Sequence, residues 1–494
     1  MIAAIIITLI CSVSIFAGFL AFRGGYTKSA DSYFVAGSSL GHFVLIFSLL
    51  ASFMSAFSVF GMASLGYRTG FGTIFVLTIN LVPLGYLWYY VHKKTYVISK
   101  VRKWQSMGAP FGERYGKEMR VLIPVVTVLA SIPYLVAQLQ GIGLMLETMS
   151  DGLVPYKVGL FFIPMFIAMY LVMGGMKGAA WANTIQGVFF FFMISLLFFV
   201  VMAKNGGFIA TMDLVSQEHP NLFQLGWAGG KVWNYPMVFG FAVAMCIGCV
   251  CFPQPYMHAF ASNSVKGFKL MSISFGALAT FLIMGTIMIG IAATVIVPGL
   301  KGLQVDKVYG MVATSLLPTW LASLAVAGGF TAAMSTVNGL VFGNAMNVSN
   351  DLYKLVKPSG SETEYIKVAR VTVVLLLAVC VFIAWDPKTP VAELSVIAFG
   401  IMAVTFFALW GAYYWKRATR WGAIASILVG AGLNIYFFII GGKKMVLFPS
   451  AELYNLNGFL VAFIATAIAF FVVSLLTKPG ETEKRYLDYF MIKV

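Results

Sequence analysis

Two adjacent hydroxyl side chains, Ser335 and Thr336, lie inside a long apolar stretch that reads AAMSTVNGL over residues 332–340. Helical spacing puts Ala332, Ser335 and Thr336 at i, i+3 and i+4, so the three residues share one face of a helix. A sodium ion without its water shell needs about five oxygen ligands, which neutral hydroxyls and freed backbone carbonyls supply without a buried fixed charge. The pair is therefore a candidate for sodium coordination, together with the carbonyl of Ala332.

A second interpretation of the same residues is helix packing. The stripe continues through Gly339 and Gly343, and small residues at this spacing let two membrane helices approach closely. In that case each hydroxyl bonds back to its own helix and contributes about 1 kcal/mol or less. The residues of this segment alone leave both interpretations open.

The remaining oxygens of a sodium site must come from a helix whose backbone is interrupted. Residues 49–66, LLASFMSAFSVFGMASLG, gather serines and a glycine in mid-span, and residues 239–255, FGFAVAMCIGCVCFPQP, combine glycines with two prolines. Unwound turns in corresponding places of two halves point to a transporter's central site, because they expose carbonyls and helix ends. Carbonyls near Ala51 and Met54 would complete the shell around Ser335 and Thr336.

These residues are carried by a chain that must live in lipid. It has 494 residues, of which 60% are hydrophobic and 10% charged, and its mean hydropathy is +0.90. A water-soluble protein has too little interior to hide that much apolar surface. Thirteen apolar segments are long enough to cross a hydrocarbon core of about 30 Å as helices. The segments lie near 1–22, 43–66, 73–92, 121–146, 158–173, 182–203, 236–252, 271–298, 321–348, 371–385, 391–415, 421–441 and 456–477.

The net charge of +16 follows the predicted topology. With the N-terminus outside, 24 of the 33 lysines and arginines fall in loops after odd-numbered segments or in the C-terminal tail, eight of them between Lys93 and Arg120. Cytoplasmic loops of membrane proteins carry such an excess. We therefore predict a multi-pass protein of the plasma (inner) membrane with a cytoplasmic C-terminus, and no nucleic-acid partner.

Other chemistries find little support in the sequence. The five cysteines fall in predicted spans, and CIGCVC at 246–251 has no histidine or carboxylate nearby, so we expect no metal beyond sodium. The histidines are scattered at segment ends or in loops, where we expect them to be interfacial or solvated, and they form no catalytic group: His42, His92, His219 and His258. No GxxxxGK phosphate loop occurs, and the tail 478–494 is too short for a signalling domain.

Several motifs together resemble the sodium/solute symporter family from end to end. They are YFVAGSSLG at 33–41, ASFMSAFSVFG at 51–61, GGMKGAAWANTIQG at 174–187, AAMSTVNGLVFGNAMNVSNDLYK at 332–354 and AFG at 398–400. The segments IAWDPKTP at 383–390 and LYKLVKP at 352–358 are most similar to the branch that includes sodium/pantothenate and monocarboxylate carriers. The chain is thus expected to be a transporter and not an enzyme.

The resemblance implies an all-α integral membrane fold of 13 transmembrane helices, built on an inverted five-helix repeat of the LeuT type. One extra helix precedes the repeats and two follow them. The implied divisions are 1–22, the repeats 43–203 and 236–415, the C-terminal pair 421–477, and the cytoplasmic tail 478–494. In the family the common sodium site uses oxygens that match Ala51, Met54, Ala332, Ser335 and Thr336 here.

Departures from the family pattern narrow the expected number of coupling ions and the expected substrate. Some members carry an aspartate in the fifth core helix that helps to hold a second sodium, where this chain has Asn183, and further hydroxyls of that site fall at Asn338 and Gly339. A single coupling ion is therefore expected. Proline carriers of the family have an aspartate where this chain has Phe53, so proline is a less favoured substrate and Phe53 is expected to form an apolar wall.

The resulting hypothesis is sodium-coupled import of a small organic solute, a carboxylate of the pantothenate or monocarboxylate type, by alternating access. The expected substrate contacts are Phe53, Ser55, Ser58, Gln138 and Cys249. The alternatives are proton coupling, another solute such as an amino acid or a sugar, or a passive channel. The hydroxyl pair cannot carry a proton at physiological pH, and a channel would need a water-lined pore. No protein partner is implied.

Overall fold

The computed structural model describes residues 2–25, 28–150, 152–224, 235–440, 450–451 and 456–492. Within them the chain is almost entirely helical, and the one ribbon pairs β1 (Ser450–Ala451) with β2 (Leu456–Asn457). The predicted all-α class is confirmed. Residue 1 of the predicted segment 1–22, residue 441 of the segment 421–441 and the last two residues of the tail 478–494 lie outside the described residues.

Nine helices in the described ranges are long and apolar enough to cross a membrane, or ten if the bent pair α3 and η2–α4 counts as one span. The count of thirteen spans and the repeat arrangement remain predictions. The bounds of the main helices are α1 Ile2–Arg23, α3 His42–Phe53, α4 Met62–Thr69, α5 Phe71–Arg102, α7 Lys117–Met149, α8 Tyr156–Lys204, α10 Tyr235–Ala242, α11 Gly248–Cys251, α12 Pro253–Ala261, α13 Val265–Ile296, α15 Thr319–Asn347, α17 Glu362–Ala384, α18 Val391–Ala403, α19 Phe406–Tyr414, α20 Arg420–Ile440 and α21 Gly458–Leu476.

Shorter helices and turns connect these elements. They are α2 Ala30–Val35, α6 Gly108–Tyr115, α9 Phe208–Glu218, α14 Val308–Leu316, α16 Lys354–Val356, α22 Glu481–Arg485 and α23 Leu487–Phe490, with the single turns η1 Ala36–Ser38, η2 Phe57–Gly61, η3 Pro220–Phe223, η5 Val243–Ile247, η6 Gly302–Lys307 and η7 Val348–Tyr353.

The fifth and sixth predicted segments, 158–173 and 182–203, are joined more tightly than the sequence suggested. Both lie in α8, which turns at Gly175, where φ is 54° and ψ is −154°. A Cβ atom on Gly175 would lie 2.8 Å from the ring of Tyr33, so both the backbone angle and the close packing require glycine here. The expected loop between the segments is therefore a single glycine kink.

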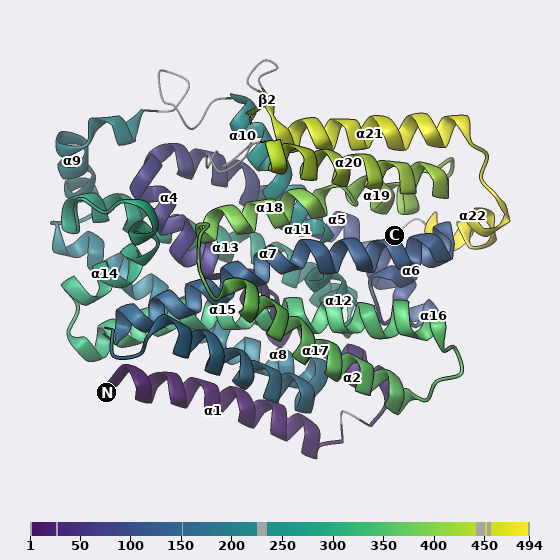
Figure 1. The fold of residues 1–494 in the computed structure, drawn as a ribbon, viewed down its shortest axis with the longest axis horizontal. Helices are drawn as coiled ribbons and strands as arrows, with labels where there is room; N and C mark the ends of the chain where they lie inside the picture. Colours follow the sequence, from purple (N-terminus) through teal and green to yellow (C-terminus); the bar gives the residue numbers. More distant parts are fainter. Residues whose placement is uncertain are drawn as a thin grey trace.

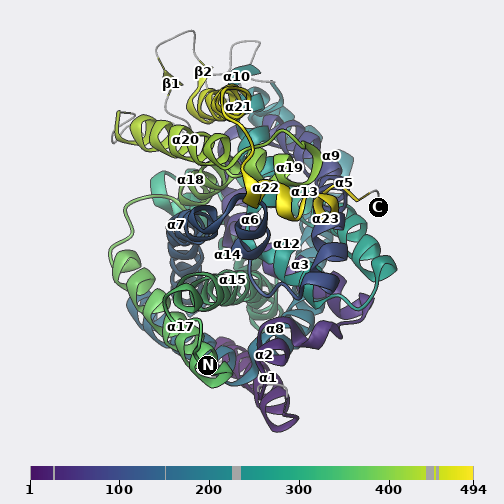
Figure 2. The same ribbon diagram turned by 90° about the vertical axis from the view of Figure 1, so that its right-hand side faces the viewer.

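Helix α15 lies at the centre of the bundle. Figures 1 and 2 show it surrounded by other helices, and it packs against α3, α7 and α8. Every residue of α15 from Ala325 to Asn347 is buried. On one flank α1 packs on α8, and on the opposite flank α20 packs on α21. Among the long apolar helices in the described ranges, the Ser335–Thr336 pair thus sits in the most buried one.

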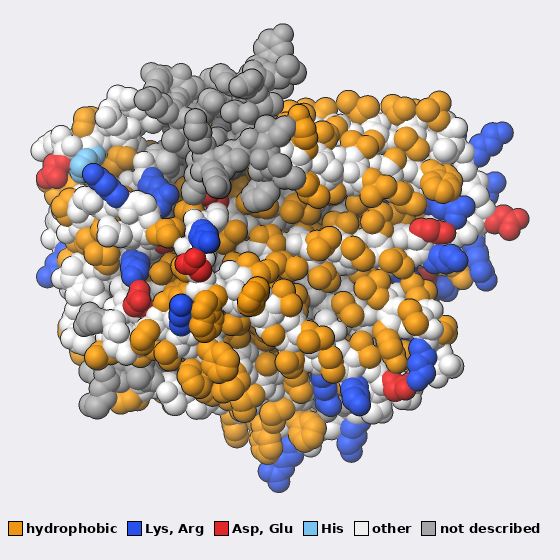
Figure 3. All heavy atoms as spheres, in the orientation of Figure 1, with side chains coloured by type: hydrophobic (Ala, Val, Ile, Leu, Met, Phe, Trp, Pro, Cys, Tyr) orange, Lys and Arg blue, Asp and Glu red, His pale blue; other side chains and the backbone are white. Residues whose placement is uncertain are grey.

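The outer surface agrees with a protein embedded in lipid. Figure 3 shows hydrophobic side chains over the middle of the visible face, with lysines and arginines toward its left-hand and right-hand ends and along its lower edge. Large apolar side chains are exposed along the helices, for example Phe382 and Leu476, which are 82% and 80% exposed. Such a band fits a hydrocarbon environment and not water.

The C-terminal helices α22 and α23 close the end of the bundle on the right in Figure 1. The buried Arg114 guanidinium donates to the Glu483 carbonyl at 3.0 Å, and the Lys94 ammonium donates to the carbonyls of Tyr413 and Phe490 at 2.7 and 3.1 Å. The Phe490 side chain is fully buried and packs on the rings of Trp104 and Tyr413. The predicted tail is therefore docked on the helices and not a free extension.

Candidate functional site

The first broken helix exposes its backbone at the centre of the bundle. Helix α3 ends at Phe53, Met54 adopts an extended conformation with φ −68° and ψ 116°, and the chain bends by 65° before η2 and α4 continue. Residues 54–55 make no regular helix, so carbonyls of the last turn of α3 after Leu50 lack helical partners. The predicted interruption of residues 49–66 is thus present at Met54.

The five predicted sodium ligands converge at this break. The Ser335 hydroxyl donates to the Ala51 carbonyl at 2.7 Å and to the Ala332 carbonyl at 2.9 Å. The Thr336 hydroxyl donates to the carbonyls of Met54 and Ala51 at 3.0 and 3.5 Å. All five residues are at most 1% exposed. The geometry therefore gathers three carbonyl and two hydroxyl oxygens around one buried point.

This arrangement differs from plain packing along a small-residue stripe. Ser335 makes one bond to its own helix, but both hydroxyls reach across to the broken helix. Carbonyls and hydroxyls are the neutral oxygen donors that a hard cation such as sodium takes, and each hydroxyl can rotate its proton away to offer a lone pair. The donor set fits an alkali cation, while the hydrogen bonds hold the same oxygens together without one.

A chain of neutral amides lies directly beside these oxygens. The Asn183 amide donates to the Ser52 hydroxyl at 2.9 Å, and the Asn338 amide donates to the Asn183 side-chain oxygen at 2.7 Å. A Cβ on Gly339 would approach both Ser52 and Gln254 at 3.2 Å. The positions that the resemblance associated with a second sodium thus form a compact amide network with no carboxylate.

The predicted substrate residues fall into two groups. Ser55 lies on the unwound turn and Ser58 on η2, with their hydroxyls 3.3 Å apart. Gln138 of α7 reaches the same place, where its side-chain oxygen accepts from the Ala56 N–H at 2.6 Å. Cys249 is buried on α11, the corresponding part of the second broken helix. Ser55, Ser58 and Gln138 thus meet at the first break, whereas Cys249 belongs to the second broken helix.

Phe53 belongs to a different environment. Its ring packs on Trp88 of α5 and Phe275 of α13, with centroids 4.6 and 5.8 Å apart. Phe53 thus sits in an aromatic cluster, whereas a second set of rings adjoins the serines. In that set Tyr134 of α7 and Phe252 lie 4.9 and 5.3 Å from Phe399 of α18.

Sequence reasoning missed these rings and misplaced two histidines. His92 and His258 were expected to be interfacial or solvated, but they are 0% and 1% exposed. The His258 ring bonds to the Ser48 hydroxyl at 2.9 Å and the His92 ring to the Val250 carbonyl at 2.8 Å. The expectation was wrong because α5 and α12 continue past the apolar stretches that marked the predicted spans. The AFG motif at 398–400 was the available signal for Phe399.

Gln140 has the structural role that its depth suggests. Its amide donates to the Thr389 carbonyl at 2.9 Å and so joins α7 to the connection before α18. Gln138, two residues earlier, faces the break instead. Two glutamines of one helix thus serve two separate joints.

A buried carboxylate ties the upper half of the first broken helix to α18. Asp306 is 1% exposed, accepts from the Val391 N–H at 3.3 Å, and lies 3.9 Å from the Arg68 guanidinium of α4. Burial raises the pKa of the Asp306 carboxyl above its ordinary value, and the nearby Arg68 charge opposes this shift. The joint at Asp306 is therefore sensitive to the charge of one side chain.

Comparison with known proteins assigns the family. The sequence matches the sodium:solute symporter family over residues 33–430, which is most of the chain. The chain belongs to the sodium:solute symporter family. Its resemblance in individual motifs is thus part of a match that runs from before the first broken helix into α20.

Relatives of this symporter carry different substrates. It is 24% identical to the sodium/pantothenate symporter of Escherichia coli (strain K12) over 82% of this chain and 83% of that protein. It is also 24% identical to a sodium/proline symporter of Haemophilus influenzae over 93% of this chain and 92% of that protein. Similar identity to carriers of two solutes does not select between them.

Solved structures confirm the fold class. A Na+-coupled sialic acid symporter in a substrate-bound outward-open state superposes with a TM-score of 0.79 at 18% identity, covering 98% of this chain and 99% of that one. A nucleobase-cation-symport-1 family transporter superposes with a TM-score of 0.56 at 14% identity, covering 92% and 98%. The protein is thus a multi-pass, sodium-coupled symporter of a small-molecule solute, and not an enzyme.

Proposed function

We propose that this symporter imports a small organic carboxylate, of the pantothenate or monocarboxylate type, together with one sodium ion held by Ala51, Met54, Ala332, Ser335 and Thr336. The observation that carries the proposal is the convergence of these five oxygens on the break in the first core helix. No charged side chain belongs to this set, so the bound ion would keep its positive charge and contribute it to the neighbouring solute site.

Sodium would act by joining two elements. The carbonyls of Ala51 and Met54 belong to the broken helix, and the hydroxyls of Ser335 and Thr336 belong to α15. An ion that draws these oxygens together stabilises the conformation in which the two elements are in contact. For coupling, sodium must bind the outward-facing conformation more tightly, because an ion with equal affinity for both conformations shifts no equilibrium. Import then follows by alternating access down the sodium gradient.

The carboxylate would bind beside the unwound turn at Ser55. Among the described residues the Ser55 backbone N–H has no hydrogen-bond partner, although this residue is completely buried. A buried N–H without a partner is rare and is a donor available to a ligand. Ser55, Ser58, Gln138 and Cys249 surround this position and are the proposed solute contacts, while Phe53 would shape the wall from the far side.

A single coupling ion fits the amide network better than two ions. The Asn183 oxygen accepts from the Asn338 amide, and the Asn338 oxygen has no partner among the described residues. Neither side chain supplies the negative charge with which a second cation is commonly held. The pantothenate relative supports a carboxylate substrate, and the proline relative makes an amino acid the second candidate. Phe53 at the position of a carboxylate in proline carriers disfavours proline.

The proposed orientation places the N-terminus outside and the C-terminus in the cytoplasm. In Figure 1 the N-terminus lies at the left-hand end of the bundle, and α22 and the basic α6 region lie toward the right-hand end. The basic excess of that end is the pattern of cytoplasmic loops.

Reconstituted protein in liposomes tests the proposal. Uptake of labelled pantothenate, lactate, pyruvate, proline and glucose is measured with an inward sodium gradient or an inward proton gradient imposed separately. We expect sodium-driven uptake of pantothenate, lactate or pyruvate and little uptake under the proton gradient alone. Uptake that ignores sodium, or sodium-driven uptake confined to proline or glucose, would contradict the proposal.

A further inference from the structure

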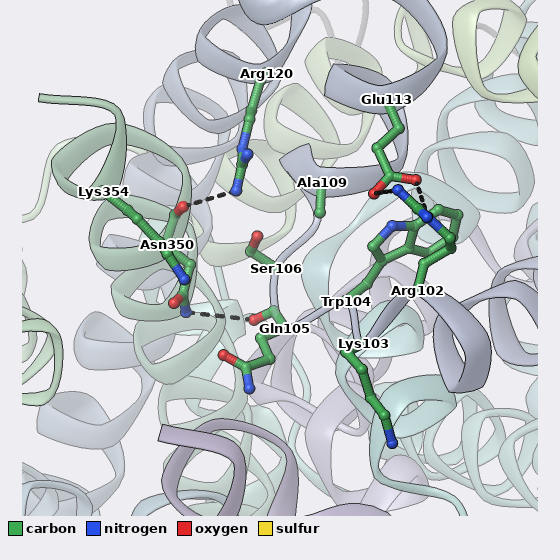
Figure 4. Close-up of a pocket in the computed structure, with 10 residues that line it drawn as sticks. All are labelled: Arg102, Lys103, Trp104, Gln105, Ser106, Ala109, Glu113, Arg120, Asn350 and Lys354. Atoms are coloured by element: carbon green, nitrogen blue, oxygen red, sulfur yellow. Dashed lines mark hydrogen bonds and ion pairs between the residues drawn. The ribbon is translucent and has the colours of Figure 1, made fainter. Parts of the chain in front are cut away.

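A recess of ≈ 130 Å³ opens at the basic end of the molecule, away from the broken helices (Figure 4). It lies between the connection 103–106 that follows α5, the helix α6, the start of α7 and the turn η7. The lining residues shown in Figure 4 are Arg102, Lys103, Trp104, Gln105, Ser106, Ala109, Glu113, Arg120, Asn350 and Lys354. The volume exceeds the space that one water molecule needs by several times, so a compact polar group fits.

The charges in this recess are unbalanced. Four of its lining side chains are cationic, and only Glu113 is acidic. The Glu113 carboxylate accepts two hydrogen bonds from the Arg102 guanidinium, at 2.9 and 3.1 Å. The Arg120 guanidinium forms an ion pair with the buried Asp351 carboxylate at 3.1 Å. Lys103 and Lys354 have no carboxylate partner among the described residues. Two positive charges thus remain without a counter-charge.

A residue that lines the recess also carries an unpaired, buried donor. Trp104 is 4% exposed, and its indole Nε1–H has no hydrogen-bond partner in the described structure. A buried polar group without a partner costs about 1–3 kcal/mol, so native proteins pair nearly all of them. The indole N–H can only donate, which makes an oxygen of a bound ligand its natural partner.

We infer that this recess binds a phosphate-bearing anion, with Lys103 and Lys354 supplying the charge and the Trp104 indole a hydrogen bond. The anion bridges the connection after α5 and the end of η7. Exposed apolar residues stand beside both lysines in the chain, since Val101 is 63% and Val356 is 84% exposed. A lipid headgroup with its acyl chains along these residues and a free phosphate share this chemistry, and basic recesses at the cytoplasmic side commonly hold acidic headgroups.

An anion here would reinforce a joint that the fold already builds. Asp351 of η7 accepts from the Ser106 hydroxyl at 2.6 Å and from the Gly108 N–H at 2.8 Å. A Cβ on Gly108 would lie 2.5 Å from the Asp351 carboxylate, so this contact depends on glycine. Because η7 continues directly from α15, the anion would strengthen the same link between α6 and the central helix. Bound anion should therefore raise the melting temperature.

The test measures thermal unfolding of the full chain in detergent at constant ionic strength. Short-chain phosphatidylglycerol, short-chain phosphatidylcholine and inorganic phosphate are titrated separately. We expect phosphatidylglycerol or phosphate to raise Tm by a few degrees at saturation, since a ligand that binds only the native state stabilises it. A shift with phosphate alone would identify a soluble anion, and a shift confined to phosphatidylglycerol a lipid headgroup. No shift with either, or an equal shift with phosphatidylcholine, would overturn the inference.

Variants separate this site from a general effect of charge. The double variant Lys103→Gln/Lys354→Gln should weaken anion binding by roughly tenfold to thirtyfold, because each basic residue near a headgroup contributes about 1 kcal/mol, or about fivefold. The matched control Lys367→Gln/Lys416→Gln removes two exposed lysines outside the recess and should keep the full shift. Trp104→Phe keeps the packing but removes the N–H, and should weaken binding severalfold. If the anion raised Tm of both recess variants as much as that of the unaltered protein, the assignment of the site would be contradicted.

Discussion

The two broken helices reach their interruptions by opposite means. At Met54 the sequence ASFMSAF contains neither proline nor glycine, and the open turn is held from outside by Ser335, Thr336 and Gln138. At Phe252, where φ is −70° and ψ is 161°, Pro253 follows at once and rings pack around the turn.

This difference separates a break imposed by partners from a break imposed by the chain. Proline has no N–H and cannot continue the preceding helix, so the second interruption persists whatever surrounds it. The first interruption has helix-compatible residues and depends on polar contacts from α15 and α7. Substitution of the side chains that contact each open turn should therefore alter the conformation of the first break strongly and that of the second only slightly.

The largest effect is expected from the hydroxyl pair. Ser335→Ala/Thr336→Val removes two of the five converging oxygens and should weaken sodium binding by at least ~30-fold, because each lost polar contact costs about 1–3 kcal/mol. The measurement is the rise in Tm caused by sodium chloride relative to choline chloride, which needs no knowledge of the solute. Ser323→Ala/Thr331→Val removes two hydroxyls that bond only within α15 and should retain the sodium response. A double variant with normal sodium response would refute the proposed site.

The next largest effect on sodium affinity is expected from Gln138 of α7, which holds the open turn through the Ala56 N–H. Gln138→Leu leaves the Ala56 N–H buried without its hydrogen-bond partner. The affinity for sodium should fall by about tenfold, because the turn that presents the Met54 carbonyl is no longer held by this bond. Gln140→Leu is the control from the same helix, because its bond goes to Thr389 instead. Equal sodium affinities in the two variants would show that the first break does not depend on Gln138.

The amide network offers a way to add charge beside the first break. Asn183→Asp would place a buried carboxylate next to Ser52 and Asn338, which should lower Tm by several degrees in the absence of sodium. Sodium should then restore stability by a larger shift than in the unaltered protein, because a cation compensates the charge. Asn183→Leu removes the same amide without adding charge and should show no such enlargement. An unchanged sodium shift in Asn183→Asp would mean that no cation reaches this position.

At the second break the expected change is smaller and of another kind. Phe252→Leu keeps an apolar side chain before Pro253 but removes one ring from the set with Tyr134 and Phe399. Solute KM should rise a fewfold, and the sodium-dependent Tm shift should stay within error, since proline still terminates α11. A loss of sodium response would show that both breaks depend on their surroundings.

The smallest effect concerns the tie between α4 and α18. Burial raises the pKa of the Asp306 carboxyl above 3.8, so the stability linked to its protonated form is fully present below pH 3.8 and is lost as the pH rises through the native pKa. Asp306→Asn keeps an acceptor for the Val391 N–H, and its Tm should fall less than that of the unaltered protein from about pH 4 to 7. The control Asp213→Asn changes an exposed residue on α9 and should leave the dependence of Tm on pH unchanged. A variant slope equal to that of the unaltered protein would contradict this assignment.

Much of the geometry of the candidate ion site was predictable because backbone and helical spacing determine it. Ser335 and Thr336 share a face at fixed helical spacing, and the family resemblance supplied the carbonyls of Ala51 and Met54, which do meet them. The proposed solute site was less predictable, because side chains from distant helices would form it. Phe53 is adjacent to Met54 in sequence, yet its ring turns to Trp88 and Phe275.

The misplaced histidines have a related cause. Apolar runs mark the part of a helix that needs lipid or core, but α5 extends to Arg102, beyond the predicted end at residue 92. His92 therefore lies within a longer helix whose inner face is covered by residues from far along the chain, such as Val250 and Tyr256. Hydropathy along one segment contains no information about what another segment covers.

The docked C-terminal helices impose an order on assembly in the cell. Arg114 and Lys94 are synthesised early, but their acceptors at Glu483 and Phe490 follow 369 and 396 residues later. Until then one end of the nascent protein carries two cations whose final carbonyl partners do not yet exist. A chain that stalls before residue 483 would therefore carry an open end that cellular quality control can recognise.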